Sequence, residues 1–136
     1  MAAGVDPRSV GLGAALQIAV SVPPAAVVAA LREDDLSAQS NLWLIAALLV
    51  LVIGPAAAGV LMGRQRPEAP LLHAAAATAM AWALLSVVIL IRAAAASDDV
   101  ASRLATLLTI APIQLGIGVL AALFSRPRPR PEETDP

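Results

Sequence analysis

The sequence contains no cysteine and no lysine, and its only aromatic residues are Trp43, Trp82 and Phe124. Without cysteine the chain forms neither disulfides nor thiolate metal sites. Charged residues make up 14% of the chain and hydrophobic residues 59%, whereas a soluble domain has about 25% charged and roughly 45–50% apolar residues. A net charge of −1 provides no general attraction to nucleic acid. The composition argues against a soluble domain, a disordered chain and a nucleic-acid-binding protein, and it predicts a membrane protein.

Charge is also absent from four long stretches of 23, 28, 23 and 22 residues, namely Ser9–Leu31, Leu36–Gly63, Ala69–Ile91 and Leu104–Ser125. A helix rises about 1.5 Å per residue, so about 20 residues cross the hydrocarbon layer once. We therefore predict an all-α polytopic membrane protein with four transmembrane helices in an up-down bundle. The predicted spans are 9–31, 41–63, 71–92 and 103–124, within a domain that covers residues 1–125. A cleaved signal peptide is the alternative for the first stretch, which is longer than the usual apolar core of such peptides.

Residues that favour helix starts stand at the span boundaries: Asp6-Pro7 before the first, Ser40 or Asn41 before the second, Pro70 before the third, and Ser97 or Asp98 before the fourth. Arginine is distributed unevenly between the two sides. Six arginines (Arg8, Arg64, Arg66, Arg126, Arg128 and Arg130) fall on the side of the termini, and three (Arg32, Arg92 and Arg103) fall on or near the other. Positive charge favours the cytoplasmic side, so both termini are predicted to be cytoplasmic.

The tail 126–136 alternates arginine with proline and then becomes acidic. Proline at every second position prevents a helix and favours extended conformations. We expect a disordered cytoplasmic anchor whose arginines lie beside anionic lipid headgroups. Docking to a cytosolic partner is the alternative.

The two predicted hairpins resemble each other. Ile53-Gly54-Pro55 followed by Gly59 aligns with Ile110-Ala111-Pro112 followed by Gly116 at an offset of 57 residues. A duplicated helical hairpin explains this match, and chance similarity between alanine-rich segments is the alternative.

Small residues are abundant, with 32 alanines in the chain. Small side chains let helices approach closely in lipid, so Gly59, Gly63, Gly116 and Gly118 are predicted helix-packing positions. The contacts lie either within one bundle or, through Gly59 and Gly63, between copies of the chain.

No Asp, Glu, Lys or Arg lies in the middle of a span, which argues against a proton-coupled pump. Gln17 and Gln114 lie at similar predicted depths, and a buried amide in lipid seeks a partner. We expect both to face the interior and to bond each other, with a polar permeation or ligand path as the alternative. The prolines Pro23, Pro24, Pro55 and Pro112 are predicted to kink their helices; broken helices of a transporter site are the alternative.

The single histidine, His73, has no neighbouring metal-ligand residues in the sequence and is expected to bond a nearby loop at the membrane interface; a pH-sensing role is the alternative. Trp82 lies near mid-span, where packing or a lipid-facing position is expected. No activated nucleophile, phosphate loop or paired carboxylate is evident. The sequence therefore predicts no enzyme, no metal and no cofactor.

The second predicted span contains Gly54-Pro55 and Gly59 and ends in Gly63-Arg64. A short loop then connects it to Pro70-Leu71-Leu72-His73. A span of small residues, a Gly-Arg turn and a Pro-Leu-x-His entry resemble small four-span membrane proteins of actinobacterial type, although Ala74 replaces the glycine that often follows the histidine there. The resemblance implies no assigned activity and no catalytic residues. Heavy use of alanine, arginine and proline fits a high-GC bacterial genome, so we expect a bacterial plasma-membrane protein.

The favoured function is a non-enzymatic accessory or scaffold subunit that acts through helix contacts, with membrane lipid and a larger membrane complex as its partners. The alternative is a small passive channel or transporter assembled as a homo-oligomer. A third reading is a bundle that binds a lipid or pigment in a groove around Trp82.

Overall fold

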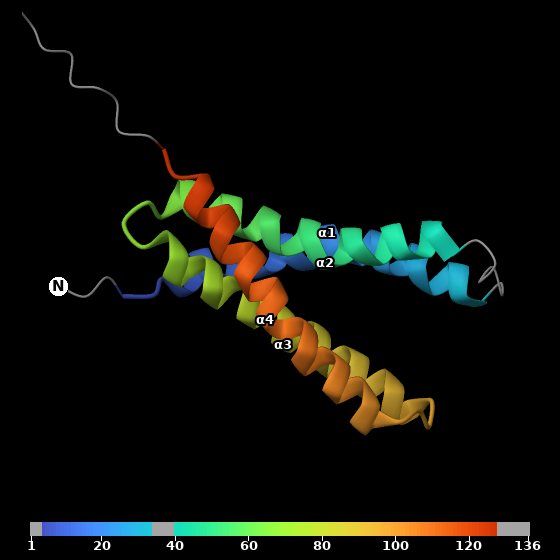
Figure 1. The fold of residues 1–136 in the computed structure, drawn as a ribbon. Helices are drawn as coiled ribbons and strands as arrows, with labels where there is room; N and C mark the ends of the chain where they lie inside the picture. The colour runs from blue at the N-terminus through green and yellow to red at the C-terminus, as the bar shows by residue number, and fades with distance from the viewer. Residues whose placement is uncertain (1–3, 34–39, 128–136) are drawn as a thin grey trace, which may run out of the picture.

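The computed structural model describes residues 4–33 and 40–127, and this part of the chain contains helices but no strands (Figure 1). Four long helices follow one another: α1 (Pro7–Glu33), α2 (Ser40–Gln65), α3 (Pro70–Ala95) and α4 (Val100–Phe124). All four are long and apolar enough to cross a membrane. The all-α, four-span prediction is confirmed, and no helix end differs from its predicted span by more than three residues. Residues 128–136 of the predicted tail, including Arg128 and Arg130, lie outside the described residues.

The first and third helices begin where the sequence predicts. The Asp6 carboxylate accepts hydrogen bonds from the Arg8 backbone N–H (3.1 Å) and the Ser9 hydroxyl (2.7 Å), and Pro7 opens α1. Pro70 opens α3, where its missing N–H leaves no helical bond unmade.

The start of α4 corrects the prediction that Ser97 or Asp98 begins it. The N-cap is Asp99, whose carboxylate accepts from the N–H groups of Ala101 (3.0 Å) and Ser102 (3.2 Å). Ser97 instead terminates α3 with a left-handed φ of 56°. The N–H groups of Ser97 and Asp98 bond carbonyls in the last turn of α3, as in a Schellman C-cap. The left-handed conformation of Ser97 therefore reverses the direction of the chain in the short turn between α3 and α4.

The helices form two antiparallel hairpins, α1–α2 and α3–α4, arranged as a V (Figure 1). The hairpins meet at the end that carries the start of α1, the α2–α3 loop and the end of α4, which we call the closed end. They diverge toward the α3–α4 turn, which we call the open end. Both α1 and α4 pack against α2 and α3, and α2 touches α3 across the middle, but α1 and α4 are not in contact over the described residues.

The interior is built from small side chains and the exterior from large ones. The fully buried positions include Ala58, Ala74, Ala77 and Ala81, with Met62 as the largest apolar side chain among them. Large aliphatic residues on all four helices are exposed, for example Leu12, Val52, Val87 and Leu108. Lipid is as apolar as these side chains, so close backbone packing rather than apolar burial holds the helices together.

Candidate binding cleft between the hairpins

Glycines allow α2 and α4 to touch in the half of the molecule nearer the closed end. A Cβ on Gly59 would lie 2.9 Å from the Cβ of Ala121 and closer still to the carbonyl oxygen of Gly118. Gly63 meets Ala122 and Ser125 in the same way. Only hydrogen fits at these positions, so the hairpins meet backbone to backbone.

Of the four predicted packing glycines, Gly116 behaves differently. A Cβ on Gly116 would meet nothing within 4 Å, and Pro112 beside it is also exposed. The segment that aligns with this one, containing Gly54, Pro55 and Gly59, is buried throughout at those three positions. The two copies of the sequence match therefore face different surroundings, and the duplication stays a prediction.

Polar side chains at the closed end form a bonded group, the closed-end cluster (Asp6, Ser9, Arg66 and His73). The Arg66 guanidinium pairs with the Asp6 carboxylate and donates from Nε to the Ser9 hydroxyl (2.8 Å). His73 is buried; its Nε2 accepts from the Asp6 backbone N–H (3.1 Å) and its Nδ1 donates to the Ala69 carbonyl (2.8 Å). The cluster ties the start of α1 to the α2–α3 loop.

Sequence reasoning placed His73 near this loop but missed the Asp6–Arg66 pair. Both residues flank predicted spans on the same side of the bundle. Opposite charges at the same end of an up-down fold were the available signal.

A second polar group lies where the hairpins part, and we call it the branch row (Gln17, Ser21, Thr78, Trp82 and Ser86). Each member has a buried polar side-chain atom that finds no hydrogen-bond partner among the described residues. The Gln17 side chain is fully buried, and both its amide atoms are without partners. An unpartnered buried amide or hydroxyl costs free energy.

The expected hydrogen bond between Gln17 and Gln114 is therefore absent over the described residues, and that prediction is wrong. Gln17 lies on α1 and Gln114 on α4, the two helices that are not in contact. The prediction rested on similar depths in the sequence, but depth does not specify which helices are neighbours.

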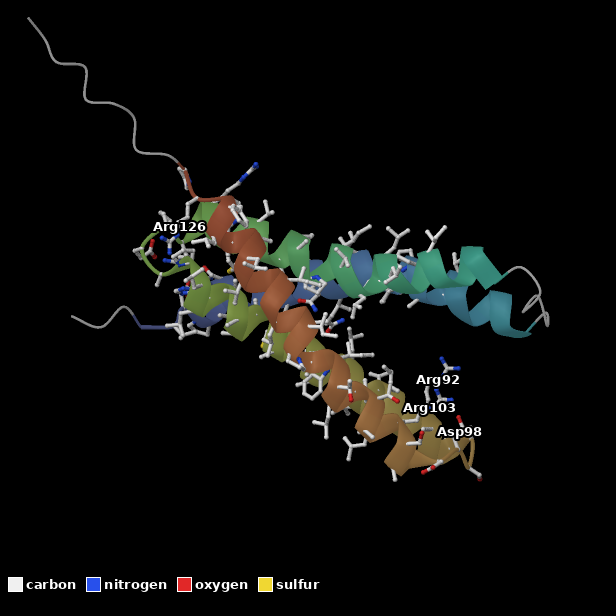
Figure 2. The ribbon with its side chains drawn as sticks, viewed as in Figure 1. Arg92, Asp98, Arg103 and Arg126 are labelled. Atoms are coloured by element: carbon white, nitrogen blue, oxygen red, sulfur yellow. The ribbon has the colours of Figure 1, made fainter. Side chains whose placement is uncertain are left out.

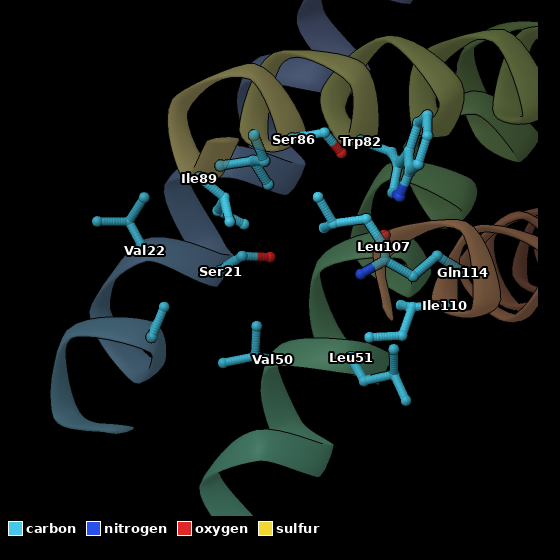
Figure 3. A pocket seen from close by; sticks show the side chains of 12 residues that line it. Ser21, Val22, Val50, Leu51, Trp82, Ser86, Ile89, Leu107, Ile110 and Gln114 are labelled. Carbon is cyan, nitrogen blue, oxygen red and sulfur yellow. The ribbon is translucent and has the colours of Figure 1, made fainter. Parts of the chain in front are cut away.

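A cavity of about 300 Å³ opens beside the branch row, and all four helices contribute to it (Figure 3). Its walls are mostly aliphatic, with Val22, Val50, Leu51, Leu85, Ile89, Leu107 and Ile110 among them. The polar side chains on it are Ser21, Ser86, Gln114 and the indole of Trp82. We call this space between the hairpins the cleft.

The half-buried indole of Trp82 lines the cleft, and its Nε1 has no partner among the described residues. For Trp82 the sequence favours packing or a lipid-facing position, and a groove around it that binds a lipid or pigment is the third alternative for the function. The signal available in the sequence was the spacing of Trp82 and Ser86, which places both on one helix face.

The predicted kink prolines lie inside continuous helices: Pro23 and Pro24 in α1, Pro55 in α2 and Pro112 in α4. Pro55 is fully buried, whereas Pro112 is exposed. Within the described ranges, no three histidine or acidic side chains are grouped as a metal site would require.

Four helices that are long and apolar enough to cross a membrane, with a cleft between them, indicate a multi-pass helical membrane protein. No protein-family model, curated protein or solved structure matches the chain. The resemblance to small actinobacterial-type four-span proteins stays a prediction.

Proposed function

We propose that this protein is a non-enzymatic accessory protein of the membrane that holds a lipophilic molecule between its two hairpins. The observation that carries the proposal is the cleft, which combines apolar walls with buried polar groups that lack partners. The proposal joins the accessory role expected from the sequence with the groove around Trp82.

The composition of the cleft indicates what kind of molecule it takes. Ligand sites in proteins are mostly apolar cavities of roughly 300–1,000 Å³ with a few polar groups that fix orientation. The indole Nε1 of Trp82 is a donor only, and the hydroxyls of Ser21 and Ser86 also donate. An apolar molecule with acceptor oxygens satisfies these groups. Such a molecule reaches the cleft from the bilayer, because the hairpins diverge toward the open end (Figure 1).

Lipid retention through purification tests this function. Ala25 lines the cleft and is exposed, so Ala25→Trp fills the space without disturbing the core; Ala79→Trp, at an exposed position that does not line the cleft, is the matched control. Native mass spectrometry after gentle detergent extraction should show bound lipid on wild type and Ala79→Trp but not on Ala25→Trp. Equal lipid on all three, or none on wild type, would contradict the proposal.

A homo-oligomeric channel is the second candidate, favoured by the open face of α4 at Gly116, which leaves room for another helix. The hydroxyls of Thr106 and Thr109 on this helix bond back to the carbonyls of Ser102 (3.0 Å) and Ala105 (2.9 Å), so they offer little to a shared pore. Flux through reconstituted protein that is lost in Gln17→Leu with Gln114→Leu, while assembly persists, would favour the channel.

We also propose that the protein lies in a bacterial plasma membrane with both termini in the cytoplasm, supported by the arginine distribution. The absence of cysteine makes single-cysteine labelling direct. In intact cells an impermeant maleimide should label Ser97→Cys but not Gln65→Cys, which should react only after permeabilisation. The reverse pattern would invert the topology.

A further inference from the structure

Two arginines lie at the open end beside the cleft. Arg92 is in the last turn of α3, and Arg103 is in the first turn of α4. With Ile89, Ala93, Ala96 and Asp98 they line a second cavity of about 280 Å³. Figure 2 shows both side chains projecting from the end of the second hairpin into the open side of the V.

This arginine cavity adjoins the cleft, because Ile89 lines both. Helix periodicity supports their continuity. On α3, Trp82, Ser86, Ile89 and Arg92 follow one another at spacings of three or four residues, which places them on one face. On α4, Arg103, Leu107, Ile110 and Gln114 do the same. Each helix therefore presents a stripe that begins with an arginine and ends at the branch row or beside it.

The length of these stripes matches one leaflet of a bilayer. Trp82 and Arg92 are ten positions apart, which is a rise of about 15 Å along a helix. Half of a hydrocarbon layer of roughly 30 Å is the same length. A molecule that fills the stripe from end to end has a polar head at the membrane surface and chains that reach mid-membrane.

The charge at the mouth favours an anionic head. Arg103 lies 3.4 Å from the Asp98 carboxylate in a half-exposed pair, and Arg92 forms no ion pair with any other described residue. The charged side chains that line the cavity are two guanidinium groups and one carboxylate, while the neighbouring Asp99 carboxylate accepts from backbone N–H groups at the start of α4. Guanidinium groups bind phosphate oxygens in a two-pronged geometry.

We infer that the cleft holds one anionic, phosphate-bearing diacyl lipid from the leaflet at the open end. Its phosphate binds Arg92 and Arg103, and its ester carbonyls accept hydrogen bonds from the hydroxyls of Ser86 and Ser21. An acyl chain runs past Leu107 and packs against the ring of Trp82, whose Nε1 it does not satisfy. This inference rests on the proposed function and adds the chemistry of the ligand's head. A transmembrane helix of another protein is the rival occupant.

The test measures lipid selectivity of the full chain in nanodiscs that contain equal amounts of phosphatidylglycerol and phosphatidylcholine. Wild type is compared with Arg92→Gln/Arg103→Gln, with the charge-retaining Arg92→Lys/Arg103→Lys, and with Arg64→Gln, which removes an exposed arginine in the last turn of α2, at the closed end. Native mass spectrometry counts the bound lipids of each class.

Wild type and Arg64→Gln should bind phosphatidylglycerol in preference, by about fivefold for each arginine beside the head, because both lipids carry a phosphate but only phosphatidylglycerol has a net negative charge. The double glutamine variant should lose this preference but keep a bound lipid, and the double lysine variant should recover most of it. Glycerol phosphate, which has the head but no chains, should not compete; competition by it would indicate a soluble phosphate site and overturn the inference.

The two proposals fail in different ways. If wild type retains lipid that Ala25→Trp loses, but without preference for the anionic class, the inference is overturned and the proposed function stands. If the double glutamine variant keeps the full preference, the inference is likewise overturned. If a stoichiometric transmembrane partner occupies the cleft in place of lipid, both are wrong.

Discussion

The closed-end cluster is a partly buried polar group and the branch row a more deeply buried one, but only the first is hydrogen-bonded among the described residues. Both ring nitrogens of His73 have partners, and Arg66 bonds Asp6 and Ser9. In the branch row neither amide atom of Gln17 has a partner among the described residues. The hydroxyls of Ser21, Thr78 and Ser86 also have none there.

This difference separates structure from function. A satisfied polar network fixes one arrangement of the chain, and the closed end is where the two hairpins are joined. Unsatisfied buried groups lower stability, and three of them, on Ser21, Trp82 and Ser86, line the cleft, which supports the proposal that they bind a molecule there. The cleft beside the branch row supplies the space for that molecule.

The largest effect is expected where α2 and α4 hold the V together. Gly59→Leu places a side chain against the backbone of Gly118, and backbone cannot give way as a side chain does. We expect a loss of about 3 kcal/mol in the free energy of unfolding, which is the upper part of the range for overpacking. Thermal unfolding in detergent measures it.

Gly116→Leu is the matched control, because a Cβ there meets open space. Its unfolding temperature should stay close to that of wild type. Leucine favours a helix more than glycine does, so equal destabilisation by both variants would show that the added side chain acts elsewhere than at the contact between the hairpins.

A smaller loss is expected from breaking the closed-end cluster. His73→Ala leaves the Asp6 N–H and the Ala69 carbonyl without their side-chain partner and opens a hole beneath α1. We expect a loss of about 2 kcal/mol. The neighbouring and exposed Leu72→Ala is the control. If His73→Ala unfolds at the same temperature as Leu72→Ala, the cluster does not stabilise the fold.

How much of this molecule the sequence predicts depends on the kind of information required. Span positions depend on local composition, so the uncharged stretches located all four helices to within three residues. Helix starts at Pro7 and Pro70 were likewise local. The left-handed turn at Ser97 was missed, because serine has no strong preference for positive φ.

The candidate site depends on which helices are neighbours, and composition does not encode that directly. Matching depths brought Gln17 and Gln114 together in the prediction, while the V places their helices at opposite corners. The stripe from Trp82 to Arg92 was present in the spacing of the sequence. Its role in a candidate site became evident only from the structure, in which these residues line the two cavities between the diverging hairpins.

The smallest change in the free energy of unfolding is expected in the branch row, and it is a gain where the other variants give a loss. Gln17→Leu replaces a buried amide without partners by an apolar side chain of similar size. Removing an unsatisfied amide should raise the free energy of unfolding by about 1 kcal/mol. Gln114→Leu, at a half-buried position on the cleft, should change the free energy of unfolding less, because that amide is only partly buried. A clear loss of stability in Gln17→Leu would mean that the amide has a structural partner in the membrane, and the contrast between the two polar groups would disappear.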